Sequence, residues 1–187
     1  MTDQPPIADP SARLTTARAD FAALRGPVRA GEPWPLAERF GTEPEASWGP
    51  REVLAHTSEM LPFWLGEYER VLEAGRGPAD PQPFGRTADD ELRVRIIERD
   101  RALPLRELFD RIDAGIDRWQ RRLAAASTGD ATPPGAGSDP TAPPADAPTG
   151  LHPRLGPMSA DDIRDRFVIT HLEDHLAQLG EILRERH

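Results

Sequence analysis

The stretch Ser159–Arg186, SADDIRDRFVITHLEDHLAQLGEILRER, is the last long amphipathic run of the chain and decides the predicted fold. Its apolar residues recur at three- and four-residue spacing, which is the pattern of one face of an α-helix. Ser159 is suited to cap the helix, and Asp161 and Asp162 complement the helix dipole in the first turn. His171 and His175 fall inside the apolar face, where an imidazole needs a polar partner.

The spacing of these two histidines has two interpretations. Residues four positions apart on a helix have Cβ atoms about 5–6 Å apart. His171 and His175 can therefore each direct one ring nitrogen at a shared metal ion. They can equally be core histidines satisfied by buried hydrogen bonds. The pair alone leaves both interpretations open, and a third ligand from another element would favour the metal.

The same helical spacing predicts three more long helices and one short one. They cover residues 11–29, 48–75, 89–101 and 104–126. Residues 127–150, STGDATPPGAGSDPTAPPADAPTG, have no apolar periodicity and many prolines, so a disordered or extended insertion is expected there. No segment has a convincing strand pattern. The predicted fold is all-α: a four-helix bundle with a short extra helix and a long Pro-rich insertion before the last helix.

The length and the ends of the chain favour one domain. A chain of 187 residues suits a single domain. Residues 1–10 are polar and proline-rich and are expected to form a flexible arm. The single bundle domain is therefore predicted to cover residues 11–186, with residues 127–150 as its insertion.

Composition excludes several classes of function. The net charge of −9 and the lack of a clustered basic patch argue against nucleic-acid binding. The chain contains no cysteine, which excludes a disulfide framework, a thiolate metal site and a cysteine nucleophile. Thiol chemistry would need a thiol from solution. No run approaches the roughly 18 apolar residues of a membrane span, and no signal peptide is evident, so a cytoplasmic protein without membrane contact is expected.

A third histidine lies on the apolar side of the second predicted helix. His56 falls at the edge of that helix's apolar arc, between the directions of Met60 and Phe63. Helical bundles build metal sites from side chains on facing helices. Three protein ligands leave a coordination position open, as in catalytic sites, whereas structural zinc usually has four. With His56 added to the pair on the last helix, the sequence favours a divalent metal, and we expect Zn²⁺ or Ni²⁺.

Two common metal motifs do not fit. The HExxH motif requires glutamate after the first histidine, where this chain has Leu172. Ferritin-like di-iron sites require Glu-x-x-His pairs, which the sequence lacks. The expected site is therefore mononuclear.

Other polar and aromatic residues are weaker candidates for the site. Glu52 and Asp174 either orient ligand imidazoles from a second shell or lie on solvated helix faces. Glu67 either faces the same cavity or lies at a surface edge. Trp48 and Trp64 either line a pocket or belong to the core.

Two further histidines are expected to be solvent-exposed. His152 follows the insertion in the segment LHPRLGP, where an exposed loop histidine is expected. His187 is the last residue and is expected to be solvated.

Two motifs carry a resemblance to a known family. The segment Trp48–His56, WGPREVLAH, is similar to the W-x-x-x-E-V-L-x-H opening of the second helix in the DinB/YfiT-like superfamily. The segment His171–Leu179, HLEDHLAQL, resembles the H-x-x-x-H last helix of that superfamily. The resemblance covers residues 11–126 and 151–186 and omits the insertion. The order, spacing and helix placement of the two motifs agree with the family.

The resemblance implies a four-helix bundle, often a homodimer, in which His56, His171 and His175 hold a divalent metal. Some members of the superfamily are thiol S-transferases that use mycothiol, bacillithiol or glutathione. One branch contains mycothiol-dependent maleylpyruvate isomerases. That branch has a carboxylate at one ligand position where this chain has His171, so the sequence departs from it there.

Two functions of different classes follow. The first is a metal-dependent transferase, in which the metal lowers the pKa of a low-molecular-weight thiol such as mycothiol and the thiolate attacks a small-molecule electrophile. A metal-bound hydroxide that performs hydrolysis fits the same three ligands. The second is a non-catalytic, metal-binding or stress-related interaction protein. A solvent-connected pocket above the histidines would favour the first function, and a closed site with a fourth protein ligand would favour the second.

Overall fold

The computed structural model describes residues 9–36, 45–128 and 147–186, which form a mostly helical chain with a small three-stranded sheet. The helical elements are α1 (Pro10–Ala30), the short 3₁₀ turn η1 (Glu45–Ser47), α2 (Pro50–Ala74), α3 (Glu91–Asp100), α4 (Leu105–Thr128), α5 (Ala160–Arg164), the π-helical turn η2 (Asp165–Thr170) and α6 (His171–Glu185). The strands are β1 (Gln82–Pro83), β2 (Thr149–His152) and β3 (Gly156–Ser159).

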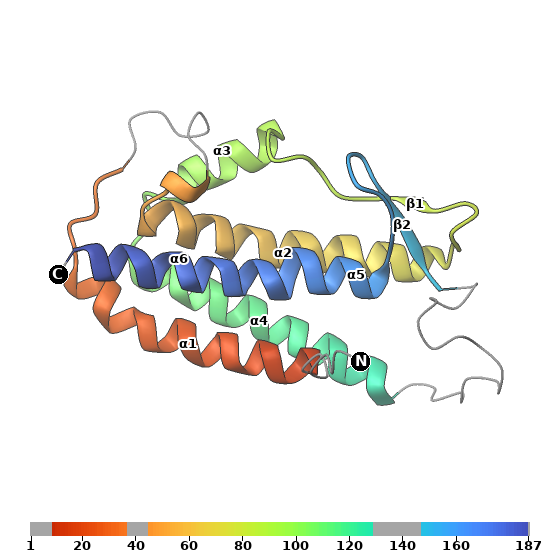
Figure 1. Cartoon of the computed structure of the whole chain (residues 1–187), viewed down its shortest axis with the longest axis horizontal. Helices are drawn as coiled ribbons and strands as arrows, with labels where there is room; N and C mark the ends of the chain where they lie inside the picture. The colour runs from red at the N-terminus through yellow and green to blue at the C-terminus, as the bar shows by residue number, and fades with distance from the viewer. Residues whose placement is uncertain (1–8, 37–44, 129–146, 187) are drawn as a thin grey trace, which may run out of the picture.

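The long helices lie side by side around one apolar core. Helix α1 packs against α4 and α6, and α2 packs against the same two helices from the other side (Figure 1). The short helix α3 covers α2 on the face away from α1. Trp119 of α4 is fully buried, and its indole nitrogen donates to the Leu61 carbonyl at 3.0 Å. None of the described helices is both long and apolar enough to cross a bilayer.

The ends of the helices follow the local sequence closely. Ser159 caps the start of the last helical segment, as the sequence predicts, and it forms a capping box with Asp162. Gly75 ends α2 with a left-handed φ of 58°, a conformation that glycine adopts without strain. Helix α1 starts at Pro10, so the predicted flexible arm of residues 1–10 is too long by its last residue, and its residues 1–8 lie outside the described part of the chain.

The chain is mostly helical, and the small three-stranded sheet corrects the prediction that no segment forms a strand. Strand β2 pairs in parallel with β1 and antiparallel with β3. The insertion predicted over residues 127–150 begins later than expected, because α4 continues to Thr128. Its last two residues are extended in β2, and residues 129–146 lie outside the described ranges. Non-local contacts hold β2: the Thr149 amide donates to the Arg76 carbonyl at 2.8 Å. A Cβ on Gly150 would lie 2.4 Å from the Phe84 ring, so only glycine fits there.

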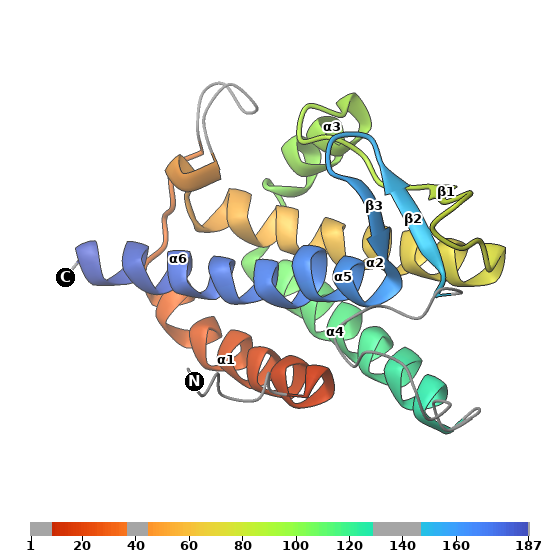
Figure 2. The same ribbon diagram turned by 45° about the vertical axis from the view of Figure 1, so that its right-hand side comes forward.

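The sheet lies over one end of the helical layer. β2 contacts α2, and β3 contacts α5, near the C-terminal end of α2 (Figure 2). The turn between β2 and β3 requires Gly156, whose φ is 79°. In this position the hairpin can form one wall of a cavity above the middle of α2 and the last helix.

The last helical segment contains a wide turn that uniform helical spacing does not predict. The six residues of η2, DRFVIT, form a π-helical turn directly before His171. A π turn holds more residues than an α turn, so residues before it are rotated relative to those after it. Val168 and Ile169 are fully buried in this turn, while Phe167 is only partly buried and faces the cavity.

The contact between α2 and α4 gives the first testable prediction. A Cβ on Gly115 would lie 2.8 Å from Cδ1 and 2.9 Å from Cβ of Leu61. Gly115→Ala should therefore lower the free energy of unfolding by about 1–3 kcal/mol through overpacking. Gly66→Ala, on the exposed side of α2 with no atom within 4 Å, should instead raise it by up to about 1 kcal/mol. Urea denaturation of both variants checks this, and a stabilised Gly115→Ala protein would contradict it.

Candidate metal centre

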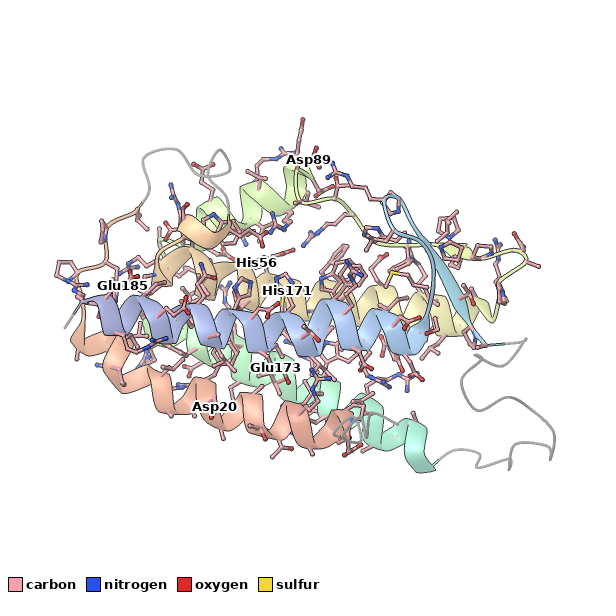
Figure 3. The ribbon with its side chains drawn as sticks, viewed as in Figure 1. Asp20, His56, Asp89, His171, Glu173 and Glu185 are labelled. Carbon is pink, nitrogen blue, oxygen red and sulfur yellow. The ribbon has the colours of Figure 1, made fainter. Side chains whose placement is uncertain are left out.

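Helices α2 and α6 bring the three predicted histidines together. His56 ends the W-x-x-x-E-V-L-x-H motif and lies near the start of α2, and His171 and His175 lie in the first turns of α6. Ring centroids are 5.1 Å apart for His56 and His171, 5.1 Å for His56 and His175, and 4.6 Å for His171 and His175. Figure 3 shows His56 and His171 in the space between the two helices. The i, i+4 spacing therefore places the rings of His171 and His175 side by side, as the sequence predicts.

Two of the ring nitrogens almost touch. Nε2 of His56 lies 2.9 Å from Nε2 of His171. A lone pair on each nitrogen would repel the other, so the pair needs either one shared proton or a cation between the two atoms. Nδ1 of His56 is buried and has no hydrogen-bond partner among the described residues.

The hydrogen bonds of Gln178 fix the tautomer of His175. The Gln178 side-chain amide donates to the Glu45 carbonyl at 2.7 Å, and a carbonyl can only accept. The Gln178 oxygen must then face Nδ1 of His175, which lies 3.0 Å away and must carry a proton. Nε2 of His175 is consequently a bare lone pair, and it is buried without a partner among the described residues.

Glu45 completes the cluster, and it was not among the residues predicted from the sequence. One carboxylate oxygen of Glu45 and one nitrogen of each of His56, His171 and His175 all lie within 4.8 Å of one another, so the four residues are close enough to bind a metal ion. Glu45 belongs to the short turn η1 in a segment read only as a connecting loop. Neither periodicity nor a motif marks Glu45. The fold alone brings it beside His56, which is 11 positions later in the chain, and beside His171 and His175, which are more than 120 positions later.

Burial keeps all three imidazoles neutral. Desolvation lowers the pKa of His56 well below its ordinary value, and the nearby His175 and Arg93 lower it further. Desolvation also lowers the pKa of His171 to about 3. The pKa of His175 is lowered by burial, against an opposing effect of its hydrogen bond to Gln178. Neutral imidazoles are the form in which histidine binds metals.

The donor set therefore fits a divalent metal. Three neutral imidazole nitrogens and a carboxylate are ligands that Zn²⁺, Ni²⁺ and Fe²⁺ accept. The partnerless Nε2 of His175 is the sharpest sign, because a buried acceptor without a partner is costly unless something binds it.

A cavity of about 920 Å³ opens directly on this cluster. Its lining includes Glu45, His56 and His171 at one end, and Trp64 and Phe167 on a wall. Trp64 stacks on Phe167 with ring centroids 4.1 Å apart. The volume lies in the range of small-molecule pockets in proteins.

The position of His152 corrects the sequence prediction. It is only 6% exposed rather than solvated, because β2 packs it beneath the hairpin, where it stacks on Phe167 at 5.2 Å. Its Nδ1 accepts from the amides of Arg154 and Leu155, and burial lowers its pKa. His152 lines the cavity and is not part of the metal-binding cluster. His187 lies outside the described residues.

The other candidate residues occupy different places. Glu52 is 1% exposed, not solvated, and pairs with Arg101. Asp174 is exposed and lines the mouth of the cavity. Glu67 accepts from the Gly85 amide and from Arg70 and so ties α2 to the loop after β1.

The two tryptophans lie close to the site. The Trp48 ring packs edge-on against His56, with centroids 5.4 Å apart, and is 4% exposed. Trp64 is 7% exposed and lines the cavity, so it belongs to the core and to the pocket at once.

Comparison with known proteins does not place the chain in a family. The chain matches no protein-family model and no curated protein sequence.

Proposed function

We propose that this protein is a divalent-metal-dependent thiol S-transferase with the four-helix-bundle architecture of the DinB/YfiT-like superfamily. His56, His171 and His175 would hold the metal, and a low-molecular-weight thiol such as mycothiol would bind beside it. When bound, the ion would lower the pKa of that thiol, so that a thiolate forms at neutral pH. The thiolate would then react with a small electrophilic molecule.

One observation carries this proposal: the cavity reaches the histidines. A metal site that only stabilised the fold would not need a pocket of about 920 Å³ lined by two of its ligands. The absence of cysteine agrees with a thiol that is supplied as a separate molecule.

The cavity has a positively charged end beside the histidines and an aromatic wall. At the metal end, Arg93 is 7% exposed and places a guanidinium beside the histidines, which favours an anion such as a thiolate there. Along the wall, Trp64, Phe167 and His152 form a stack of rings that offers an aromatic surface to a ligand. We expect the carbon skeleton of a substrate to lie along this wall.

A structural metal site is the second candidate, because Glu45 supplies a fourth protein donor. Four protein ligands are typical of closed zinc sites. A metal-activated hydroxide that performs hydrolysis would use the same open position as the thiol.

The test is a titration of mycothiol, bacillithiol and glutathione into metal-loaded protein at neutral pH. We expect the ultraviolet absorbance of a metal-bound thiolate for one of the thiols, and S-alkylated product when an electrophile is added. The His171→Ala variant should show neither. Metal-loaded protein that gives no thiolate signal and no transfer with any of the three would contradict the transferase and favour the structural site.

A further inference from the structure

Hydrogen bonds hold both the side chain and the main chain of Glu45 in place. Its Oε1 accepts from Nη2 of Arg93 on α3. The main-chain carbonyl of Glu45 accepts from the Gln178 side chain on α6 at 2.7 Å and from the Trp48 amide at 3.1 Å. Oε2 of Glu45 has no hydrogen bond among the described residues. A side chain held in this way, beside three neutral imidazoles, is prepared to bind something through its second oxygen.

We infer that Glu45 is a fourth protein ligand of the metal, which it binds through Oε2 while Arg93 holds Oε1. This inference rests on the metal site of the proposed function and adds a residue that no motif identifies. It also predicts a metal that accepts more than four ligands.

The charge balance of the site supports a ligand role. Arg93 is 7% exposed, and its positive charge acts on all three histidines by lowering their pKa. A divalent cation placed among those histidines would be repelled by the same guanidinium. The Glu45 carboxylate, bound to Arg93 on one side and facing the histidines on the other, offsets that repulsion.

Gln178 couples Glu45 to His175. Its amide spans the 2.7 Å bond to the Glu45 carbonyl and the 3.0 Å contact to Nδ1 of His175. One side chain therefore fixes the position of η1 and the tautomer that presents Nε2 of His175. Gln178 acts as a positioning residue for two ligands from different parts of the chain.

The number of donors points to a high coordination number. One carboxylate oxygen and three imidazole nitrogens lie within 4.8 Å of one another, and the cavity reaches three of these four residues. Three histidines, Glu45 and an open position facing the cavity require five or six ligands, which suits Ni²⁺ or Co²⁺ better than tetrahedral Zn²⁺.

The experiment uses Co²⁺ as a spectroscopic probe in the full-length chain and in Glu45→Gln. The matched control is Glu173→Gln, which removes one carboxylate from α6 on the side that faces α1, where Glu173 pairs with Arg13 (Figure 3). Affinity is measured by competition with a coloured chelator, and coordination is followed in the visible absorption spectrum. Circular dichroism confirms that each variant is folded.

We expect the weak visible absorption of five- or six-coordinate Co²⁺ in the parent protein and in Glu173→Gln. Glu45→Gln should bind Co²⁺ roughly 10- to 100-fold more weakly and show a changed spectrum. Unchanged affinity would overturn the inference and leave the three-histidine site standing. Weaker binding with an unchanged spectrum would overturn it too, because the carboxylate would then act through charge alone.

Two further outcomes test the coordination number and the metal site itself. The intense absorption of four-coordinate Co²⁺ in the parent protein would overturn the expanded coordination. A parent protein that binds no Co²⁺ at all would overturn the proposed function together with this inference.

Discussion

The metal-free protein should lose stability steeply as the pH falls below about 6.5, toward the lowered pKa of His171. In an unfolded chain a histidine has a pKa of about 6.5, whereas burial in the fold lowers the pKa of His171 to about 3 and also lowers those of His56 and His175. Between these values the unfolded state binds more protons, so the free energy of unfolding falls as pH falls. At pH 5, His171 alone should lower the free energy of unfolding by up to about 2 kcal/mol relative to neutral pH.

Urea denaturation at several pH values in the presence of a chelator measures this effect. The His171→Gln variant keeps a polar side chain but cannot bind the proton, so its stability should depend less on pH over the same interval. Saturating divalent metal should shift the loss to lower pH, because protons and the metal compete for the same nitrogens. Parallel pH curves for the parent and the variant would show that His171 is not buried as a neutral imidazole.

Removing Arg101 should strongly destabilise the fold. Nη1 of Arg101 lies 3.1 Å from Oε1 of Glu52, and the two residues are 7% and 1% exposed. Arg101→Met leaves the Glu52 carboxylate buried without this counter-charge, which typically costs about 3–5 kcal/mol.

The matched control for this substitution comes from α3. Arg95→Met breaks an exposed pair with Glu91 and should change stability by less than about 1 kcal/mol. The double variant Glu52→Gln, Arg101→Met should recover part of the lost stability, because no uncompensated charge remains. If thermal and urea denaturation place Arg101→Met and Arg95→Met at the same stability, the buried pair does not have the role described.

The sequence predicts the helices well because their signals are local. The stripe in the last segment, the Ser159 capping box and the glycine after α2 are all readable within a few residues. The pairing of His171 with His175 follows from helical spacing, and His56 falls on the apolar side of its own helix. For these reasons three of the four clustered donors could be named from the sequence.

The remaining features depend on contacts between distant segments. Strand β2 pairs with β1, more than 60 residues away, and neither TGLH nor GPMS has the alternation of a strand. His152 appears exposed in the sequence only because the hairpin that buries it is not visible there. Glu45 lies in a turn without periodicity, and nothing local marks the π-helical turn before His171.

The most direct test of the central claim is the metal content of protein purified without a histidine tag, determined by elemental mass spectrometry. The parent chain is compared with His171→Ala and with His152→Ala, which removes a buried histidine from the same cavity but not from the cluster. We expect about one divalent ion per chain in the parent and in His152→Ala, and none in His171→Ala. No metal in the parent after addition of Zn²⁺ or Ni²⁺, or equal metal content in His171→Ala, would contradict the metal site.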